Sequence, residues 1–269
     1  MFRRLKISCE NLSLVSGLLK KNCRNLLQLE VIEKSNQWLV KRCREMNSAI
    51  SIPRPFSVRL AKAQDEPHIM HFLREHLYDE EPLLRSLNIT KTMAIPCLEA
   101  YLNDHLKDGF TMIAVEPDNR IVGISLNQRN CDWEGDKLRE RAERVQCDPL
   151  RKLFYIWSIV AKEPKLHQKY RTSCIFEIAI LATAREAQRR GIGYQLTVQS
   201  LRLARDLGFD WARMDCTSEY SSRIAKKVGM DCTWSVPYKH LVDSAKKPVV
   251  IPDEPHSHIR VHVIQLRGS

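Results

Sequence analysis

Residues 174–207 read CIFEIAILATAREAQRRGIGYQLTVQSLRLARDL, and this stretch predicts the centre of the fold. Its first part, residues 174–181, is almost entirely apolar, and such a run is typical of a mostly buried strand. Its last part, residues 196–207, spaces its apolar side chains as an amphipathic helix does. Two glycines lie between these parts. The sequence therefore predicts a strand, a glycine turn and a helix in succession.

The glycine turn has features of a phosphate-binding site. It reads QRRGIG over residues 188–193. Gly191 and Gly193 leave backbone N–H groups without side-chain cover, and the positive end of the following helix dipole lies behind them. Arg189 and Arg190 add positive charge. Turn glycines are also common in ordinary strand-to-helix connections, and the spacing matches neither a P-loop nor a full dinucleotide motif.

In this context the pattern Gln-x-x-Gly-x-Gly resembles the acetyl-CoA signature of the GNAT superfamily of acetyltransferases. In that family the loop amides wrap the pyrophosphate of CoA, and the preceding strand splays open to admit the pantetheine arm. The resemblance implies an α/β fold, a central twisted mixed β-sheet flanked by helices, with acetyl-CoA as cosubstrate. The implied cofactor-binding residues are Ile180, Leu181, Ala182, Gln188, Arg189, Arg190, Gly191, Ile192, Gly193, Tyr194 and Ser218.

Length and composition limit the class of protein. The chain has 269 residues, of which 43% are hydrophobic and 28% charged, so it can form one domain with a full core plus an appendage. No apolar run reaches the ~18 residues of a membrane-spanning helix, and we expect no membrane association. The nine cysteines are scattered and contain no Cys-x-x-Cys pair. They predict reduced thiols in a cytoplasmic protein, without a disulfide frame or a metal site.

The N-terminal segment differs from the rest of the chain. Residues 1–54 hold 11 Lys and Arg against 4 Asp and Glu, so they carry +7 of the net charge of +11. We expect a basic extension over residues 1–54, either an arm or a mitochondrial transit peptide, and a catalytic domain over residues 55–269. The smaller charge of that domain argues against a nucleic-acid partner. We expect a monomer that acts on a small-molecule amine.

The predicted elements of the domain alternate between strands and helices. Pro82 is expected to stop the first helix. An apolar helix over residues 150–160 carries Tyr155 and Trp157, which we place in the core, with the lining of an arylalkyl pocket as the alternative. The strands are predicted at 56–60, 110–115, 121–126, 174–181, 211–216, 233–238 and 259–266, and the remaining helices at 65–77, 92–106, 134–146 and 217–228.

Two further strings resemble one branch of the superfamily, the insect arylalkylamine N-acetyltransferases, which acetylate dopamine, serotonin and similar amines. Residues 79–83, DEEPL, are similar to the branch's Asp-Glu-Pro-Leu, in which the Glu before Pro is the general base. The resemblance therefore implies Glu81 as the base. Residues 216–223, CTSEYSSR, look like the branch's Cys-Ser-Ser-x-Tyr-Ser-x-Arg, whose first and last serines assist the base. Those positions are Thr217 and Ser221.

The implied reaction is direct acetyl transfer from acetyl-CoA to an arylalkylamine in a ternary complex. A primary amine is almost all ammonium at neutral pH, so it must lose a proton before it attacks a thioester. A partly buried carboxylate is a suitable acceptor. Glu177, within the buried strand, is a rival base to Glu81. A backbone N–H near Leu181 or Ala182 is the candidate donor to the developing oxyanion.

Several alternatives remain open from the sequence. Many superfamily members have a Tyr general acid at the position of Ala225, and its absence here keeps open a non-catalytic, CoA-binding GNAT-like domain. Among enzymes, the alternatives are an acetyltransferase for polyamines or for protein lysines. Glu81 could also be an ordinary helix end, and Thr217 or Ser218 an ordinary helix N-cap.

Overall fold

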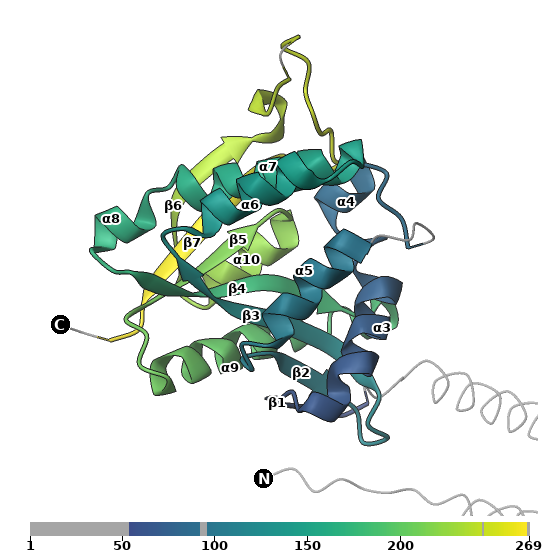
Figure 1. Cartoon of the computed structure of the whole chain (residues 1–269). Coiled ribbons are helices and arrows are strands. Elements are labelled where there is room, and N and C mark those ends of the chain that lie inside the picture. Colours follow the sequence, from purple (N-terminus) through teal and green to yellow (C-terminus); the bar gives the residue numbers. More distant parts are fainter. Residues whose placement is uncertain (1–53, 92–95, 244, 268–269) are drawn as a thin grey trace, which may run out of the picture. The chain divides into compact units, whose positions relative to one another are not determined.

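The computed structural model describes residues 54–91, 96–243 and 245–267. The basic extension predicted for residues 1–54, with the transit-peptide hypothesis, lies outside these residues except for Arg54. Within the described part, seven strands form one mixed sheet in the order β1-β2-β3-β4-β5-β7-β6 (Figure 1). The predicted fold class, a mixed sheet flanked by helices, is confirmed.

The strands of the sheet are mostly antiparallel. Among the described strands, β4 and β5 are the one parallel pair, and the other neighbours are antiparallel. Because parallel neighbours need a crossover connection, a helix links β4 to β5. The strands are β1 (Ser57–Leu60), β2 (Met112–Val115), β3 (Ile121–Cys131), β4 (Cys174–Thr183), β5 (Trp211–Cys216), β6 (Asp231–Pro237) and β7 (His258–Gln265).

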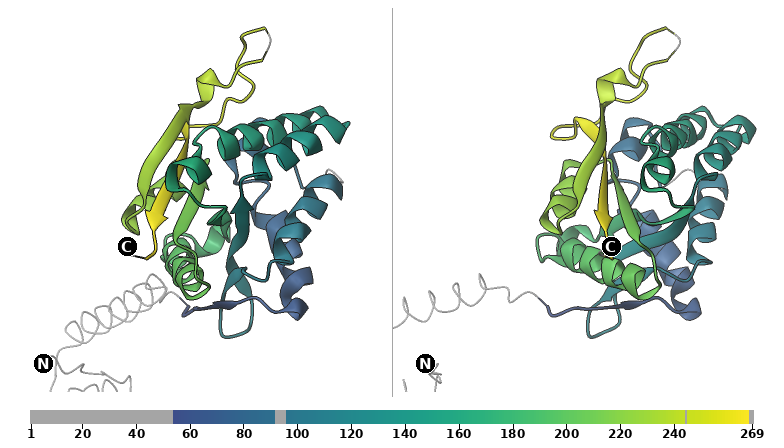
Figure 2. Two further views of the ribbon diagram at one scale, coloured as in Figure 1. Left: turned by 60° about the vertical axis from the view of Figure 1, so that its left-hand side comes forward. Right: turned by 90° about the vertical axis from the view of Figure 1, so that its left-hand side faces the viewer.

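Helices cover both faces of this sheet. The helices are α3 (Glu66–His76), α4 (Pro82–Ser86), α5 (Pro96–Leu106), α6 (Glu134–Arg144), α7 (Asp148–Lys162), α8 (Leu166–Tyr170), α9 (Ile192–Asp206) and α10 (Glu219–Lys227). Helices α9 and α10 pack on one face, and α3 and α5 on the other (Figure 2). Helices α6 and α7 pack against each other beside the sheet. None of the helices in the described ranges combines the length and apolar character needed to cross a bilayer.

Two predicted helix boundaries are wrong. Pro82 does not stop the first helix, because α3 already ends at His76, and Pro82 instead begins the separate helix α4. The fixed φ and the missing N–H of proline suit the first helical turn. Helix α10 begins at Glu219 with Ser218 as its N-cap, so Thr217 precedes the helix. The Ser218 side chain accepts a hydrogen bond from the backbone N–H of the first turn, which is the usual role of an N-cap serine.

Strand β3 is longer than the apolar pattern predicts. It continues past Leu126 to Cys131, although residues 127–130 are polar. These polar residues pair with β4, and Asn127, Gln128 and Asn130 are buried. A strand with a polar buried face has no apolar periodicity, so its end could not be read from hydrophobicity.

The expectation that all cysteines are reduced is wrong for one pair. Cys131 and Cys174 form a disulfide although they are 43 positions apart in the sequence. The antiparallel register of β3 and β4 places these two residues opposite each other, with their Cα atoms 4.4 Å apart. Sequence spacing does not reveal such a cross-strand pair. The free cysteines in the described part are Cys97, Cys147, Cys216 and Cys232.

Candidate active site

The sheet opens between β4 and β5. These strands pair only over residues 176–178 and 212–214. Just beyond, Ile178 pairs with Asn127 and Ile180 with Leu126, so Ala179 forms a bulge that bends β4. A cavity of about 1410 Å³ occupies the opening. Typical pockets for one small ligand measure ~300–1,000 Å³, so this cavity has room for two substrates.

One end of the cavity is built by β4 and the glycine turn. The first N–H groups of a helix have no partner within it, and the first four of α9 point from this turn. A Cβ atom at Gly193 would lie 3.0 Å from Ile224 Cδ1 and 3.6 Å from Leu181 Cδ2, so a side chain there would crowd the wall of the cavity. The cradle therefore fits the diphosphate of CoA. The lining includes Ile180, Leu181, Ala182, Gln188, Arg189, Gly191, Ile192, Gly193, Tyr194 and Ser218, all predicted for the cofactor.

Arg190 is the exception among the predicted cofactor residues. Its guanidinium donates to Glu116 Oε1 at 2.7 Å and to the backbone oxygen of Arg54 instead of lining the cavity. Glu116 also accepts from Arg120 at 2.7 Å. The Arg190 side chain thus anchors the glycine turn to the β2–β3 hairpin. Arg189, which does line the cavity, is the neighbouring arginine available to a phosphate.

Glu81 lines the cavity on its other side, at the start of α4. It is the N-cap of that helix, and its carboxylate accepts a hydrogen bond from the Leu84 N–H at 2.7 Å. Burial raises the pKa of Glu81 above its ordinary value of 4.5, while the Leu84 N–H and the Thr217 side chain act in the opposite direction. Glu81 is therefore both a helix cap and a carboxylate whose raised pKa makes it a better proton acceptor than an exposed Glu.

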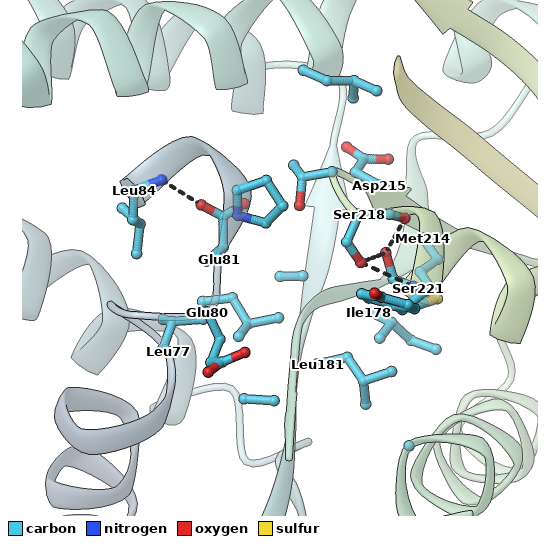
Figure 3. Close-up of a pocket in the computed structure, with 18 of the residues that line it drawn as sticks. Leu77, Glu80, Glu81, Leu84, Ile178, Leu181, Met214, Asp215, Ser218 and Ser221 are labelled. Atoms are coloured by element: carbon cyan, nitrogen blue, oxygen red, sulfur yellow. Dashed lines mark hydrogen bonds between the residues drawn. The ribbon is translucent and has the colours of Figure 1, made fainter. Parts of the chain in front are cut away.

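Thr217 and Ser221 line the same cavity as Glu81. Figure 3 shows Glu80 and Glu81 on one side and Ser218 and Ser221 on the opposite side. The Ser221 hydroxyl donates to the backbone oxygen of Ser218 at 3.0 Å, and the two hydroxyl oxygens are 2.9 Å apart. Thr217 lies before α10, so the two predicted helpers do not share one helix face. The structure nevertheless brings them to the wall of one cavity.

Tyr238 is a residue that the sequence analysis missed. Its hydroxyl donates to the backbone oxygen of Thr217 at 2.6 Å, and the residue is buried. Burial raises the pKa of Tyr238, and the nearby charge of Glu81 adds to this effect, so the hydroxyl stays protonated. The bond holds Thr217 beside Glu81. In the sequence, a tyrosine at the end of a strand looks like an ordinary core residue.

Glu177, the rival base, also lines the cavity. Its residue is 6% exposed, and its Oε2 accepts from Gln128 at 2.6 Å and from Asn130 at 2.8 Å. Glu177 is four residues from Leu181 along β4, or about 13 Å at ~3.3 Å per residue. The rival base therefore lies farther along β4 from the glycine turn than Leu181 does.

The part of the cavity around Glu177 is an inner chamber with polar and aromatic walls. Trp157 stacks on Tyr101 with 5.2 Å between ring centroids, and both line the chamber. Tyr155, the other predicted aromatic, is 47% exposed and lies outside it. The prediction that Tyr155 lies in the core is therefore wrong, while Trp157 lines the cavity. We define the inner chamber as Tyr101, Gln128, Asn130, Glu134, Trp157 and Glu177.

Comparison with known proteins supports the fold. No protein-family model matches the chain. The solved structure of arylalkylamine N-acetyltransferase 2 from Aedes aegypti matches with a TM-score of 0.74 and 24% identity, covering 79% of this chain and 99% of that one. The mosquito arylalkylamine N-acetyltransferase like 5b matches with a TM-score of 0.73 and 19% identity, covering 78% of this chain and 100% of that one.

A third similar structure comes from an enzyme with another substrate. The Drosophila melanogaster polyamine N-acetyltransferase, which forms N-acetylagmatine, matches with a TM-score of 0.71 and 21% identity, covering 78% of this chain and 100% of that one. At these identities the likeness establishes the fold. The chain has the GNAT acetyltransferase fold that the glycine turn predicted.

Proposed function

We propose that this protein transfers an acetyl group from acetyl-CoA to the primary amine of a small molecule. One observation carries the proposal: the uncovered N-terminus of α9 and the half-buried carboxylate of Glu81 open into the same cavity. The first suits the diphosphate of CoA, and the second suits removal of a proton from an ammonium group. The amine N-acetyltransferases with the same fold lend support.

Each residue then has a defined task. Acetyl-CoA, when bound, supplies the thioester carbonyl that the amine attacks. Gly191 and Gly193 give the backbone N–H groups at the start of α9 access to the diphosphate. Glu81 takes the proton from the ammonium group of the substrate, directly or through a water. Thr217 and Ser221 orient the amine or that water by hydrogen bonds.

We further propose an arylalkylamine as substrate, the class that the sequence resemblance implies. The stacked rings of Tyr101 and Trp157 support it, because they offer a surface for an aromatic ring. A polyamine is the second candidate, supported by the carboxylates of Glu134 and Glu177 in the same chamber.

A thiol-release assay tests the activity. We expect release of CoA from acetyl-CoA in the presence of at least one amine among tyramine, dopamine and spermidine, and little release with a lysine-containing peptide. Acetyl-CoA without amine is the control for hydrolysis. Binding of acetyl-CoA without turnover of any amine would instead favour the non-catalytic CoA-binding alternative.

Ser221→Ala should lower kcat roughly ten-fold with little change in acetyl-CoA affinity. The Ser221 hydroxyl is expected to orient a reacting group rather than to accept its proton, and lost orientation has a moderate effect. Steady-state kinetics with the best amine of the panel measures the change. Ser221→Thr retains a hydroxyl and should recover part of the rate. An unchanged kcat in Ser221→Ala would remove this residue from the machinery.

A further inference from the structure

The proposed base and its helper are held by different elements. Glu81 begins α4, whereas Thr217 directly follows β5. Figure 3 shows Glu81 and Ser221 on opposite sides of the opening. A hydrogen bond from the Thr217 side chain nevertheless reaches the Glu81 carboxylate. The separation between α4 and the end of β5 must therefore be fixed, and the segment that connects β6 to β7 bonds to both.

The first links of this segment are to α4. The backbone N–H of Ile251 donates to Ser86 Oγ at 2.7 Å, and Arg85 Nη2 donates to Asp253 Oδ2 at 2.6 Å. The side chains of Arg85 and Asp253 are 50% and 70% exposed, and ion pairs at such sites contribute little to stability. The hydrogen bond to Ser86 is therefore the link that matters more for holding α4.

Burial fixes the same segment from below. Val250 is 2% exposed and belongs to the main hydrophobic core together with Leu84 of α4 and Tyr238. The side chain of the next residue, Ile251, is 75% exposed. The position of Ile251 thus depends on its backbone hydrogen bond rather than on apolar packing. A buried anchor and a backbone bond one residue later together hold the segment next to α4.

Tyr238 links the segment to the end of β5. Strand β7 lies between β5 and β6 in the sheet, and the Tyr238 side chain crosses it to donate to the backbone oxygen of Thr217 at 2.6 Å. The backbone N–H of Tyr238 donates to the oxygen of Ser257 at 3.0 Å. His256 Nδ1 accepts from the backbone N–H of Glu219, the first residue of α10, at 3.1 Å. The segment is therefore bonded to both walls of the cavity.

We define residues 250–257 together with Tyr238 as the brace. We propose that the brace sets the separation between Glu81 and Thr217, and that Tyr238 and Ser86 are positioning residues for proton removal from the amine. This inference rests on the proposed acetyl transfer and assigns residues that act on the base through other residues. With both links formed, the amine meets the carboxylate and the hydroxyl in one fixed geometry.

Tyr238→Phe tests the link to Thr217, because it removes one hydroxyl and keeps the buried ring. Burial raises the pKa of Tyr238, so its hydroxyl is protonated and the substitution removes no charge. We expect kcat to fall ~10-fold, as lost orientation gives, with the KM for the amine and the affinity for acetyl-CoA nearly unchanged. Tyr170→Phe is the matched control, since that ring stacks on Trp211 and does not line the cavity.

The pH profile separates positioning from a general loss of structure. The hydrogen bond from Thr217 favours the ionised form of Glu81 and so lowers its pKa. A weaker bond in Tyr238→Phe should raise this pKa and move the acidic limb of kcat to higher pH. A variant that is only less stable would lose rate without moving the limb. The substitution leaves in place the other charged or titratable side chains that line the cavity before and on α4, on β5 and on the brace: Glu80, Arg85, Asp215, Asp253, Glu254 and His256.

Ser86→Ala tests the link to α4 from the opposite side of the brace. Without the hydroxyl, the Ile251 N–H loses its partner on α4. We expect a smaller loss of kcat, ~3-fold, because a single exposed hydrogen bond contributes modestly, and the same shift of the acidic limb to higher pH. Ser86→Thr keeps a hydroxyl at this position and should recover the rate and the profile. Thermal melts of all variants show whether they are folded.

A direct titration of Glu81 makes the test independent of turnover. The NMR signal of the Glu81 carboxyl carbon, assigned by its absence in Glu81→Gln, reports the pKa in the wild-type and variant proteins. A higher pKa in Tyr238→Phe, without thiol release by the wild-type protein, would support the brace and overturn the proposed function.

Two results would overturn the brace and leave acetyl transfer standing, provided that the wild-type protein turns over an amine. One is an unchanged kcat and an unchanged titration of Glu81 in folded Tyr238→Phe and Ser86→Ala. The other is a loss of kcat that is equal at all pH values, with the acidic limb in place, because a merely structural role predicts this. If Tyr238→Phe does not fold, Ser86→Ala and its Thr counterpart decide by the same criteria.

Discussion

Glu81→Gln should lower kcat for acetyl transfer by ~10²–10⁴-fold and leave the affinity for acetyl-CoA nearly unchanged. Glutamine keeps the size of the side chain but cannot accept the proton of the ammonium group. Glu81 lies at the start of α4, whereas the glycine turn lies at the start of α9. The substitution should therefore leave the binding of acetyl-CoA at the glycine turn unaffected. Steady-state kinetics and calorimetry with acetyl-CoA measure the two effects separately.

The pH dependence gives a second readout for Glu81. Burial raises the pKa of this carboxyl above 4.5 in the folded protein, so the group becomes protonated at a higher pH than an exposed Glu. A protonated base cannot accept another proton, and the rate should fall as the pH drops through this raised pKa. Glu81→Gln should lack this acidic limb, with its residual rate nearly independent of pH in the same range.

Stability at neutral pH provides the control for the Glu81 variant. A carboxyl whose folded pKa is raised favours the unfolded state above that pKa and stabilises the folded state as the pH falls through it. Removing its charge should therefore leave the melting temperature at pH 7 unchanged or slightly higher. The amide oxygen of Gln can still accept from the Leu84 N–H and cap α4. Near-normal kcat in Glu81→Gln, with activity abolished in a folded Glu177→Gln, would place the base on β4.

The cofactor end was predictable because its signals are local. An apolar run, two glycines and an amphipathic pattern follow one another within residues 174–207, and each depends only on its neighbours in the sequence. The opening of β4 from β5 follows from the fold that these signals identify. Arg190 was misassigned because its partner, Glu116, is 74 residues away. A charge next to a phosphate cradle looks the same in the sequence whichever way its side chain points.

The inner chamber could not be predicted for the opposite reason. Its residues come from α5, β3, α6, α7 and β4, and only the packing of these elements brings them together. Polar residues of β3 such as Gln128 lack the apolar pattern of a buried strand. Gln128 is nevertheless buried, and its side-chain amide donates a hydrogen bond to Glu177. The cross-strand disulfide was missed in the same way, since it depends on the register between β3 and β4.

The start of α9 and the inner chamber differ in the charge that they present to a ligand. The start of α9 favours anionic groups, because the positive end of the helix dipole and uncovered N–H groups lie there. The inner chamber instead contains the carboxylates of Glu134 and Glu177, which interact with the buried guanidinium of Arg213. An anionic cosubstrate would therefore bind at the start of α9, in the same cavity that Glu81 and Thr217 line.

Gly193→Asp should weaken acetyl-CoA binding at least ~100-fold, which corresponds to ~2.7 kcal/mol. Gly193 is the second residue of α9, and its missing side chain leaves the backbone open to the cavity. Aspartate would place a negative charge where the diphosphate is expected. A Cβ atom there approaches Ile224 Cδ1 at 3.0 Å, the end of a flexible side chain that can move aside. Isothermal titration with acetyl-CoA measures the change.

The controls for Gly193 separate charge from bulk. Gly193→Asn has nearly the same shape as Gly193→Asp without the charge, so it should retain more affinity than the aspartate variant. Aspartate in the first turn of a helix interacts favourably with the dipole, so Gly193→Asp should not melt earlier than Gly193→Asn. The same charge that stabilises the free helix should repel the ligand. Equal affinity of the wild-type and Gly193→Asp proteins for acetyl-CoA would show that the diphosphate does not bind at the start of α9.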